Sequence, residues 1–155
     1  MRKYLMVFTA VLLLFASCEG PVGPMGPKGD KGDGTYWFVK TYTINSNQWK
    51  LVNGSDNIGS FYQAEVVIPE LDEDIYEEGN VFCYLFQTVD GVEVQTPLPY
   101  NIPWGEVHNN GEESLWTEFY FYDFTKGSIM FYAYYSDFYT SNRPPTASFR
   151  VVLNY

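Results

Sequence analysis

Histidine, cysteine and basic residues are scarce in this chain, and each scarcity argues against a class of function. The 155 residues include one histidine, two cysteines and nine lysines and arginines, against 19 aspartates and glutamates, so the formal net charge is −10. Nucleic-acid binding depends on clustered lysine and arginine that neutralise phosphates, so we expect no nucleic-acid partner. Zinc centres need several histidine or cysteine ligands, and we expect no metal and no cofactor.

The two cysteines also argue against a disulfide framework. Cys18 ends an apolar leader, and only Cys83 lies in the rest of the chain. A single cysteine cannot form a disulfide within its own domain. Cys83 belongs to the apolar run of residues 81–86, and we expect it to be a buried small residue rather than a nucleophile.

Residues 1–17 have the layout of a cleaved signal peptide. Arg2 and Lys3 precede an apolar stretch that ends in small residues, and this stretch is shorter than the about 20 residues of a membrane span. Residues 15–18, Phe-Ala-Ser-Cys, resemble a bacterial lipobox. The resemblance implies cleavage before Cys18 and a lipid thioether on its sulfur, and several acyl chains on one residue anchor a protein stably. An ordinary secretory signal with an incidental cysteine is the alternative.

Residues 18–34 join this cysteine to five Gly-X-Y triplets, which begin at Gly20, three of them with proline at X. Glycine at every third position is the collagen signature, because only glycine fits the axis of the triple helix. The tract is interpreted either as a solvated semi-rigid spacer or as the stalk of a homotrimer. In a stalk, lysines and aspartates of neighbouring chains would pair. Either form holds the following domain away from a membrane.

Residues 35–155 are predicted to form one all-β domain, an antiparallel β-sandwich of Ig-like or jelly-roll-like type. About eight short strands with regular turn signals support this class. The expected strands are residues 35–44, 48–52, 61–68, 81–89, 92–96, 115–124, 128–135 and 148–155. A short helical turn is expected near residues 70–78, capped by Gly79 in the left-handed region. Asp90-Gly91 predicts a two-residue hairpin turn, and three prolines predict an irregular stretch from Pro97 through Trp104.

Five short segments of this domain carry a resemblance: residues 68–71, 79–81, 97–100, 136–138 and 149–153. Together with the leader and the triplets they resemble a group of small Bacteroidetes surface-type lipoproteins. The plan of that group is a lipobox, a short collagen-like tract and one β-rich domain. The resemblance implies a lipid-anchored protein of the bacterial cell envelope, in the outer membrane. The domain then lies either on the periplasmic face of this membrane or on the exposed face. It brings no catalytic residues.

Aromatic side chains are the main candidates for a contact surface. Alternation along residues 115–124 places Leu115, Phe119 and Phe121 on one face, which we expect to be core. The opposite face and its equivalent on residues 128–135 carry the candidates Trp116, Tyr120, Tyr122, Tyr132 and Tyr134. These rings either cover each other, or contact a protein, or stack on sugar, with Trp104 and Trp116 the best stacking residues.

Catalysis is not expected. His108 is the single histidine and lies in a polar loop, and nothing in the sequence brings two carboxylates to one cleft for glycoside hydrolysis. The acids of residues 70–78 lack the spacing of a calcium loop and are interpreted as a solvated helix face. The expected function is therefore a membrane-anchored lipoprotein that displays a structural or interaction module. The alternative is a carbohydrate-binding module that uses exposed tryptophan and tyrosine.

Overall fold

The computed structural model describes residues 36–53 and 58–155. The leader, Cys18 and the Gly-X-Y tract lie outside the described residues. The described residues belong to one compact unit. The described residues confirm the all-β class, with two antiparallel sheets that share one core.

Nine strands lie in the part of the chain that the structure describes. They are β1 (Trp37–Ile44), β2 (Lys50–Val52), β3 (Phe61–Val67), β4 (Asn80–Val89), β5 (Val92–Pro97), β6 (Tyr100–Val107), β7 (Glu113–Thr125), β8 (Ser128–Tyr135) and β9 (Ala147–Asn154). The 3-10 turn η1 (Ser46–Gln48) joins β1 to β2, and the short helix α2 (Glu73–Glu78) joins β3 to β4. No helix in these described residues is long and apolar enough to cross a membrane.

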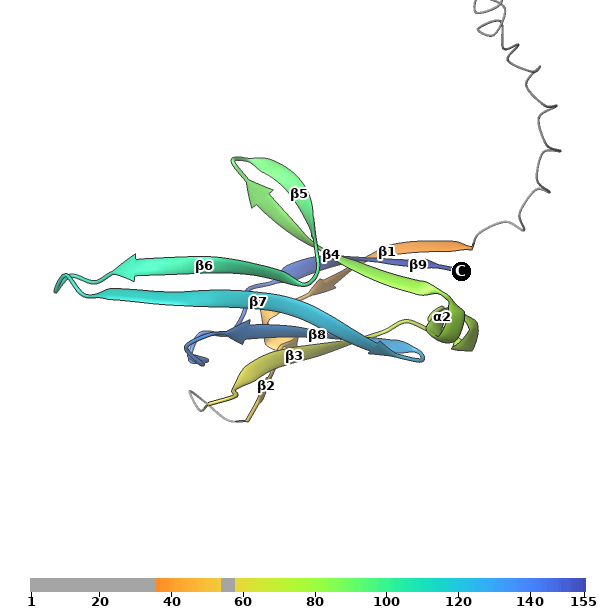
Figure 1. Ribbon diagram of the computed structural model, residues 1–155, viewed down its shortest axis with the longest axis horizontal. Helices are drawn as coiled ribbons and strands as arrows, with labels where there is room; N and C mark the ends of the chain where they lie inside the picture. Colours follow the sequence, from red (N-terminus) through yellow and green to blue (C-terminus); the bar gives the residue numbers. More distant parts are fainter. Residues whose placement is uncertain (1–35, 54–57) are drawn as a thin grey trace, which may run out of the picture. The chain divides into compact units, whose positions relative to one another are not determined.

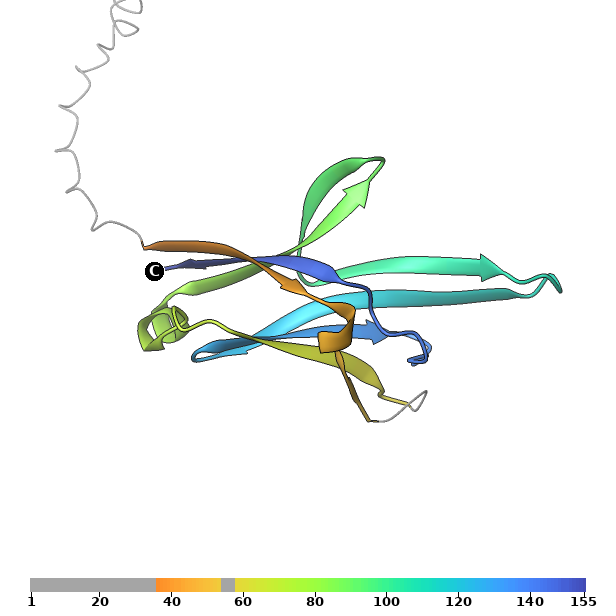
Figure 2. The same cartoon turned by 180° about the vertical axis from the view of Figure 1, so that it is seen from behind.

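The strand order joins the two ends of the chain. One sheet has the order β1-β9-β4-β5 and the other β2-β3-β8-β7-β6, and Figures 1 and 2 show them from opposite sides. The first strand pairs with the last, and β3 pairs with β8. This nesting of early and late strands favours the jelly-roll alternative over the Ig alternative.

Large side chains from both sheets meet in the core. Phe131 of β8 and Phe149 of β9 stack with ring centroids 4.3 Å apart, and both are fully buried. Trp49, which is 1% exposed, contacts Phe149 and Tyr120 at centroid distances of 6.2 and 6.4 Å. Burying one such side chain contributes about 1.5–3 kcal/mol, so these rings hold the two sheets together.

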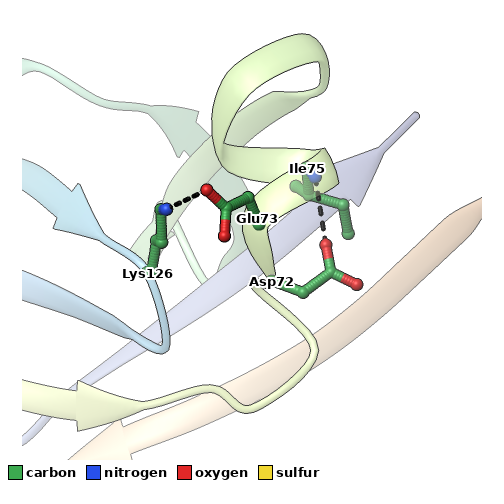
Figure 3. A network of polar contacts seen from close by, with 4 residues as sticks. All are labelled: Asp72, Glu73, Ile75 and Lys126. Carbon is green, nitrogen blue, oxygen red and sulfur yellow. Dashed lines mark hydrogen bonds and ion pairs between the residues drawn. The ribbon is translucent and has the colours of Figure 1, made fainter.

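Helix α2 is shorter than the sequence predicts, because it begins at Glu73 and not at residue 70. Figure 3 shows its first turn, where Oδ1 of Asp72 accepts a 3.0 Å hydrogen bond from the backbone N–H of Ile75. This is an N-cap, which satisfies one of the free N–H groups at a helix start. Glu73 forms an ion pair with Lys126 of the β7–β8 turn, and Ile75 is buried in the core.

The expected role of Gly79 is wrong. Its φ of −88° and ψ of −171° are extended, not left-handed. Glycine is needed here for a close approach, since an added Cβ would lie 2.7 Å from the carbonyl oxygen of Asn154 and 2.8 Å from that of Ile75. The helix therefore ends against β9 without a left-handed cap.

The irregular stretch predicted around the three prolines is also wrong, because β6 forms there. β6 is the edge strand of its sheet and pairs only with β7. An edge strand tolerates Pro103 because its missing N–H can face away from the ladder. The hairpin predicted at Asp90-Gly91 is confirmed, with φ of 51° and 79° at the two turn residues.

Candidate functional site

The expected core face of residues 115–124 is wrong. Leu115 is 75% exposed and Phe121 is 40% exposed, whereas Tyr120 is 6% exposed. The register explains the reversal, because Tyr120 lies opposite the buried Ala133 of β8. The inward tyrosines also keep hydrogen-bond partners, and the hydroxyl of Tyr122 donates to the carbonyl of Val81 at 2.8 Å. A tyrosine with a partner can replace phenylalanine in a core.

The faces predicted for residues 128–135 are confirmed. Ile129, Phe131 and Ala133 are buried, while Tyr132 and Tyr134 lie on the outer face. The six aromatic candidates are thus not one surface. Tyr120 and Tyr122 point into the core, Tyr132 and Tyr134 lie on the opposite side of the sheet, and Trp104 and Trp116 lie on the inner face toward the free end of β6 and β7.

The outer-face tyrosines pack against phenylalanines of β7. Tyr132 stacks on Phe121 with centroids 4.7 Å apart and planes at 15°, and Tyr134 lies 5.7 Å from Phe119. The Tyr132 hydroxyl donates to Asp123 at 2.7 Å. Desolvation, followed by this bond and the charge of Asp123, raises the pKa of Tyr132 to about 12. These four rings, the outer aromatic layer, pack in pairs and stay partly exposed.

Trp104 and Trp116 lie directly opposite each other on β6 and β7. In Figure 1 the β6–β7 hairpin extends past the ends of its neighbouring strands. The inner face of this hairpin therefore continues beyond the facing sheet, where β9 begins only at Ala147. Trp104 remains 48% exposed. Two tryptophans thus occupy opposite positions of neighbouring strands, on a face that the rest of the domain leaves partly uncovered.

Two adjoining cavities follow this inner face. One has a volume of about 570 Å³ and contains Trp104, Glu118 and Arg143 in its lining. The other has a volume of about 510 Å³ and is lined in part by His108 and Asp137. Both fall within the 300–1,000 Å³ typical of ligand pockets. Three residues line both of them: Trp116, Tyr135 and Asn142. We call the two cavities together the tryptophan groove.

Glu118 organises the floor of the tryptophan groove. Its Oε2 accepts a 3.2 Å hydrogen bond from Nε1 of Trp104, and its Oε1 accepts a 2.8 Å bond from the hydroxyl of Tyr120. Burial, and then the charge of Glu118, raise the pKa of both Tyr120 and Tyr135 above the ordinary tyrosine range. Both phenols therefore stay protonated as donors, and the carboxylate stays fixed between them and the indole.

One wall of the groove is the loop of residues 136–146, and hydrogen bonds tie it to the core. The hydroxyl of the buried Tyr62 donates to the carbonyl of Thr140, and Nε1 of Trp49 donates to the carbonyl of Pro145 at 3.2 Å. Phe138 has a φ of 58°, which is strained for a bulky residue, and its ring packs edge-on against Tyr134 at 5.4 Å. These contacts attach the wall to the core and to the outer face of β8.

Sequence reasoning missed most of the groove lining, including Glu118, Tyr135, Asn142 and Arg143. The spacing Trp116-x-Glu118-x-Tyr120 could have placed Glu118 on the tryptophan face, because alternate residues of a strand share a face. Asn142 and Arg143 reach the groove from a loop, and no local pattern places them there. At the far end of the groove, Nε2 of His108 lies 2.8 Å from Oγ of Ser114.

The groove offers flat indole surfaces, a fixed carboxylate, amides and one guanidinium. Within residues 36–53 and 58–155, no group of three His, Cys, Asp or Glu side chains is arranged to hold a metal ion. Cys83 is buried, as expected, and desolvation raises the pKa of its thiol to about 12. The indole, carboxylate, amide and guanidinium groups of the groove suit a ligand that has both apolar faces and many hydroxyl groups. Comparison of the chain with protein-family models, with curated proteins and with solved structures gave no match.

Proposed function

We propose that the domain binds carbohydrate in the tryptophan groove and that the chain is a lipid-anchored, non-catalytic display protein. One observation supports this above the others: Trp104 and Trp116 occupy opposite positions on β6 and β7, both are partly exposed, and Trp104 donates a hydrogen bond to the carboxylate of Glu118. Gln87 and Asn142 line the same cavity. An aromatic strip flanked by acid and amide side chains favours sugar over a protein partner.

The chemistry of a sugar ring matches these groups. A pyranose has a C–H face that packs on an indole and a rim of hydroxyls that donate and accept hydrogen bonds. Indole rings supply apolar area with little loss of side-chain entropy. Carboxylate, amide and guanidinium groups then read the hydroxyl positions. A few oriented polar groups on an aromatic surface are the usual composition of a small-molecule site.

A binding role rather than a catalytic one follows from the engagement of Glu118. Both of its oxygens accept hydrogen bonds, from Trp104 and from Tyr120. A general acid must hold a proton in reach of the leaving oxygen, whereas these two bonds direct both oxygens of Glu118 toward donors of the protein itself. Glu118 therefore serves as an acceptor for sugar hydroxyls and as a support for Trp104.

The leader and the Gly-X-Y tract complete the proposal. A lipid on Cys18 anchors the chain in the bacterial outer membrane, and residues 20–34 carry the domain away from it. The test is metabolic labelling with an alkynyl fatty acid in a bacterial host, with wild type compared with Cys18→Ser. Label on the wild type alone supports the anchor. Equal labelling of both chains, or of neither, contradicts it.

Binding is tested by applying the full chain, purified in detergent, to an array of soluble glycans. We expect Trp116→Ala to abolish binding and Trp104→Ala to weaken it at least tenfold. Phe121→Ala is the matched control, because it removes a ring that is about as exposed as Trp104 from the outer face of β7, the strand that carries Trp116. Binding that survives both tryptophan substitutions would overturn the groove as the site, and no binding to any glycan would overturn the function.

The outer aromatic layer favours a second candidate, contact with a second copy of the chain. Phe119, Phe121 and Tyr134 surround a shallow apolar hollow of about 250 Å³. A trimer formed by the Gly-X-Y tract would bring such faces to high local concentration. Phe121→Asp places a charge in the layer, so it lowers the mass of an assembly measured by light scattering. An unchanged mass would exclude this contact.

A further inference from the structure

The shape of the tryptophan groove points to the size of its ligand. Its two cavities adjoin at Trp116, Tyr135 and Asn142, which line both. Trp104 lines only one of them, and Tyr139 only the other. A ligand that stacks on Trp116 therefore has space on both sides.

The length of the groove follows from the strand that forms its floor. Alternate residues of β6 from Tyr100 to Glu106 line the two cavities. The six steps from Tyr100 to Glu106 span about 20 Å at a rise of about 3.3 Å per residue. This is longer than one or two sugar rings, so a short sugar would leave one cavity empty.

The charge of the groove limits the kind of polysaccharide that it accepts. Glu106, Glu118 and Asp137 contribute three carboxylates, against one guanidinium from Arg143. The whole chain also carries a formal net charge of −10. A cleft lined by one sign of charge concentrates its field and repels ligands of the same sign. Uronate-rich and sulfated glycans are therefore disfavoured.

We infer that the groove binds one segment of a neutral polysaccharide, several rings long, which lies along β6 and β7 and occupies both cavities at once. This inference rests on the proposed carbohydrate-binding function and names its ligand class. Trp104 and Trp116 stack on adjacent sugar rings of the polysaccharide. Glu118 lies between these two tryptophans and the core of the domain. Tyr139 contacts the rings that lie beyond Trp116.

Calorimetric titration of the full chain in detergent tests the length. The probes are neutral glucan, xylan and mannan oligosaccharides of two, four and six rings. We expect affinity to rise at least tenfold between two and six rings of the series that binds. Tyr139→Ala should weaken six-ring binding several-fold and leave two-ring binding unchanged. Tyr76→Ala, which removes a similarly exposed ring on α2, should change neither.

The outcomes separate this inference from the function on which it rests. Equal affinity for two and six rings, lost in Trp116→Ala, would leave carbohydrate binding intact and overturn the extended ligand. Polygalacturonate and heparin test the charge, and tighter binding of either than of every neutral glycan would overturn the neutral class. No binding by any probe would overturn both the inference and the proposed function.

Discussion

The indole Nε1 of Trp104 donates a 3.2 Å hydrogen bond to Oε2 of Glu118, which lies on the neighbouring strand. The other oxygen of Glu118 accepts a 2.8 Å bond from the hydroxyl of Tyr120. One carboxylate therefore links an exposed ring to a buried one. A ring held in this way loses less freedom when a ligand binds, and preorganisation of this kind increases affinity.

Glu118→Gln is expected to weaken this link without removing the side chain. Glutamine offers one acceptor oxygen where glutamate offers two, so Trp104 and Tyr120 lose one good acceptor between them. We expect the free energy of unfolding to fall by about 1 kcal/mol, measured by urea denaturation, together with weaker glycan binding. Glu113→Gln on the exposed part of β7 is the control. Identical denaturation curves for both variants would contradict the role assigned to Glu118.

Two tryptophans are expected to differ sharply when replaced by alanine. Trp49 is 1% exposed and contacts rings from both sheets, so Trp49→Ala should lower the free energy of unfolding by about 3–5 kcal/mol. Trp104→Ala removes a half-exposed ring and one hydrogen bond, and should cost about 1 kcal/mol. Urea denaturation of both variants measures the difference. Similar losses would mean that Trp104 serves the core and not a binding surface.

The faces of β7 and β8 show how far alternation alone predicts this fold. For β8, apolar residues alternate with tyrosines, and the apolar side is the core as predicted. For β7, both alternating sets are aromatic, and the pairing with β8 decides which set is buried. A shift of one residue turns every side chain of a strand to the other face. Hydropathy favoured Phe121 over Tyr120, but it could not include the hydrogen bonds that satisfy the tyrosine hydroxyls.

Neither β6 nor the groove could be predicted from a local sequence pattern. Pro103 weakens a strand prediction, yet it is compatible with an edge strand, and the position in the sheet cannot be derived from proline spacing. The groove joins Trp104 and Trp116, which the sequence analysis selected, to Asn142 and Arg143 from a later loop. The two groups of residues meet because residues 136–146 connect the end of β8 to the start of β9, and this loop forms one wall of the groove.

The cap of helix α2 is expected to contribute measurably to stability. Asp72→Ala removes the acceptor for the backbone N–H of Ile75, and loss of such a cap lowers the free energy of unfolding by about 1 kcal/mol. Asp74→Ala is the matched control, since it removes an exposed acid of the same turn that does not cap the helix. Thermal denaturation of both variants is the measurement. An equal loss in Asp74→Ala would assign the effect to charge near the helix start.

The domain is expected to lose stability in alkali. Burial raises the pKa of Cys83 from 9.0 to about 12, and that of Tyr122 from 10.0 to about 12. Because the fold favours the protonated forms, their contribution is complete below about pH 9 and is lost as pH rises toward about 12. The melting temperature should therefore fall across this range. Tyr122→Phe should melt lower at neutral pH but show a shallower decline, and an unchanged decline would contradict the assignment.

The mass of the chain in solution tests the two interpretations of the Gly-X-Y tract. We expect residues 19–155 and residues 34–155 both to be monomers by light scattering, because five triplets with three prolines make a short triple helix. A trimer in the longer chain alone would contradict the spacer. In that case Gly26→Ser should dissociate it, since only glycine fits the axis, whereas Met25→Ser at a Y position should not. A trimer of both chains would place the contact in the β domain, where Phe121→Asp should disrupt it.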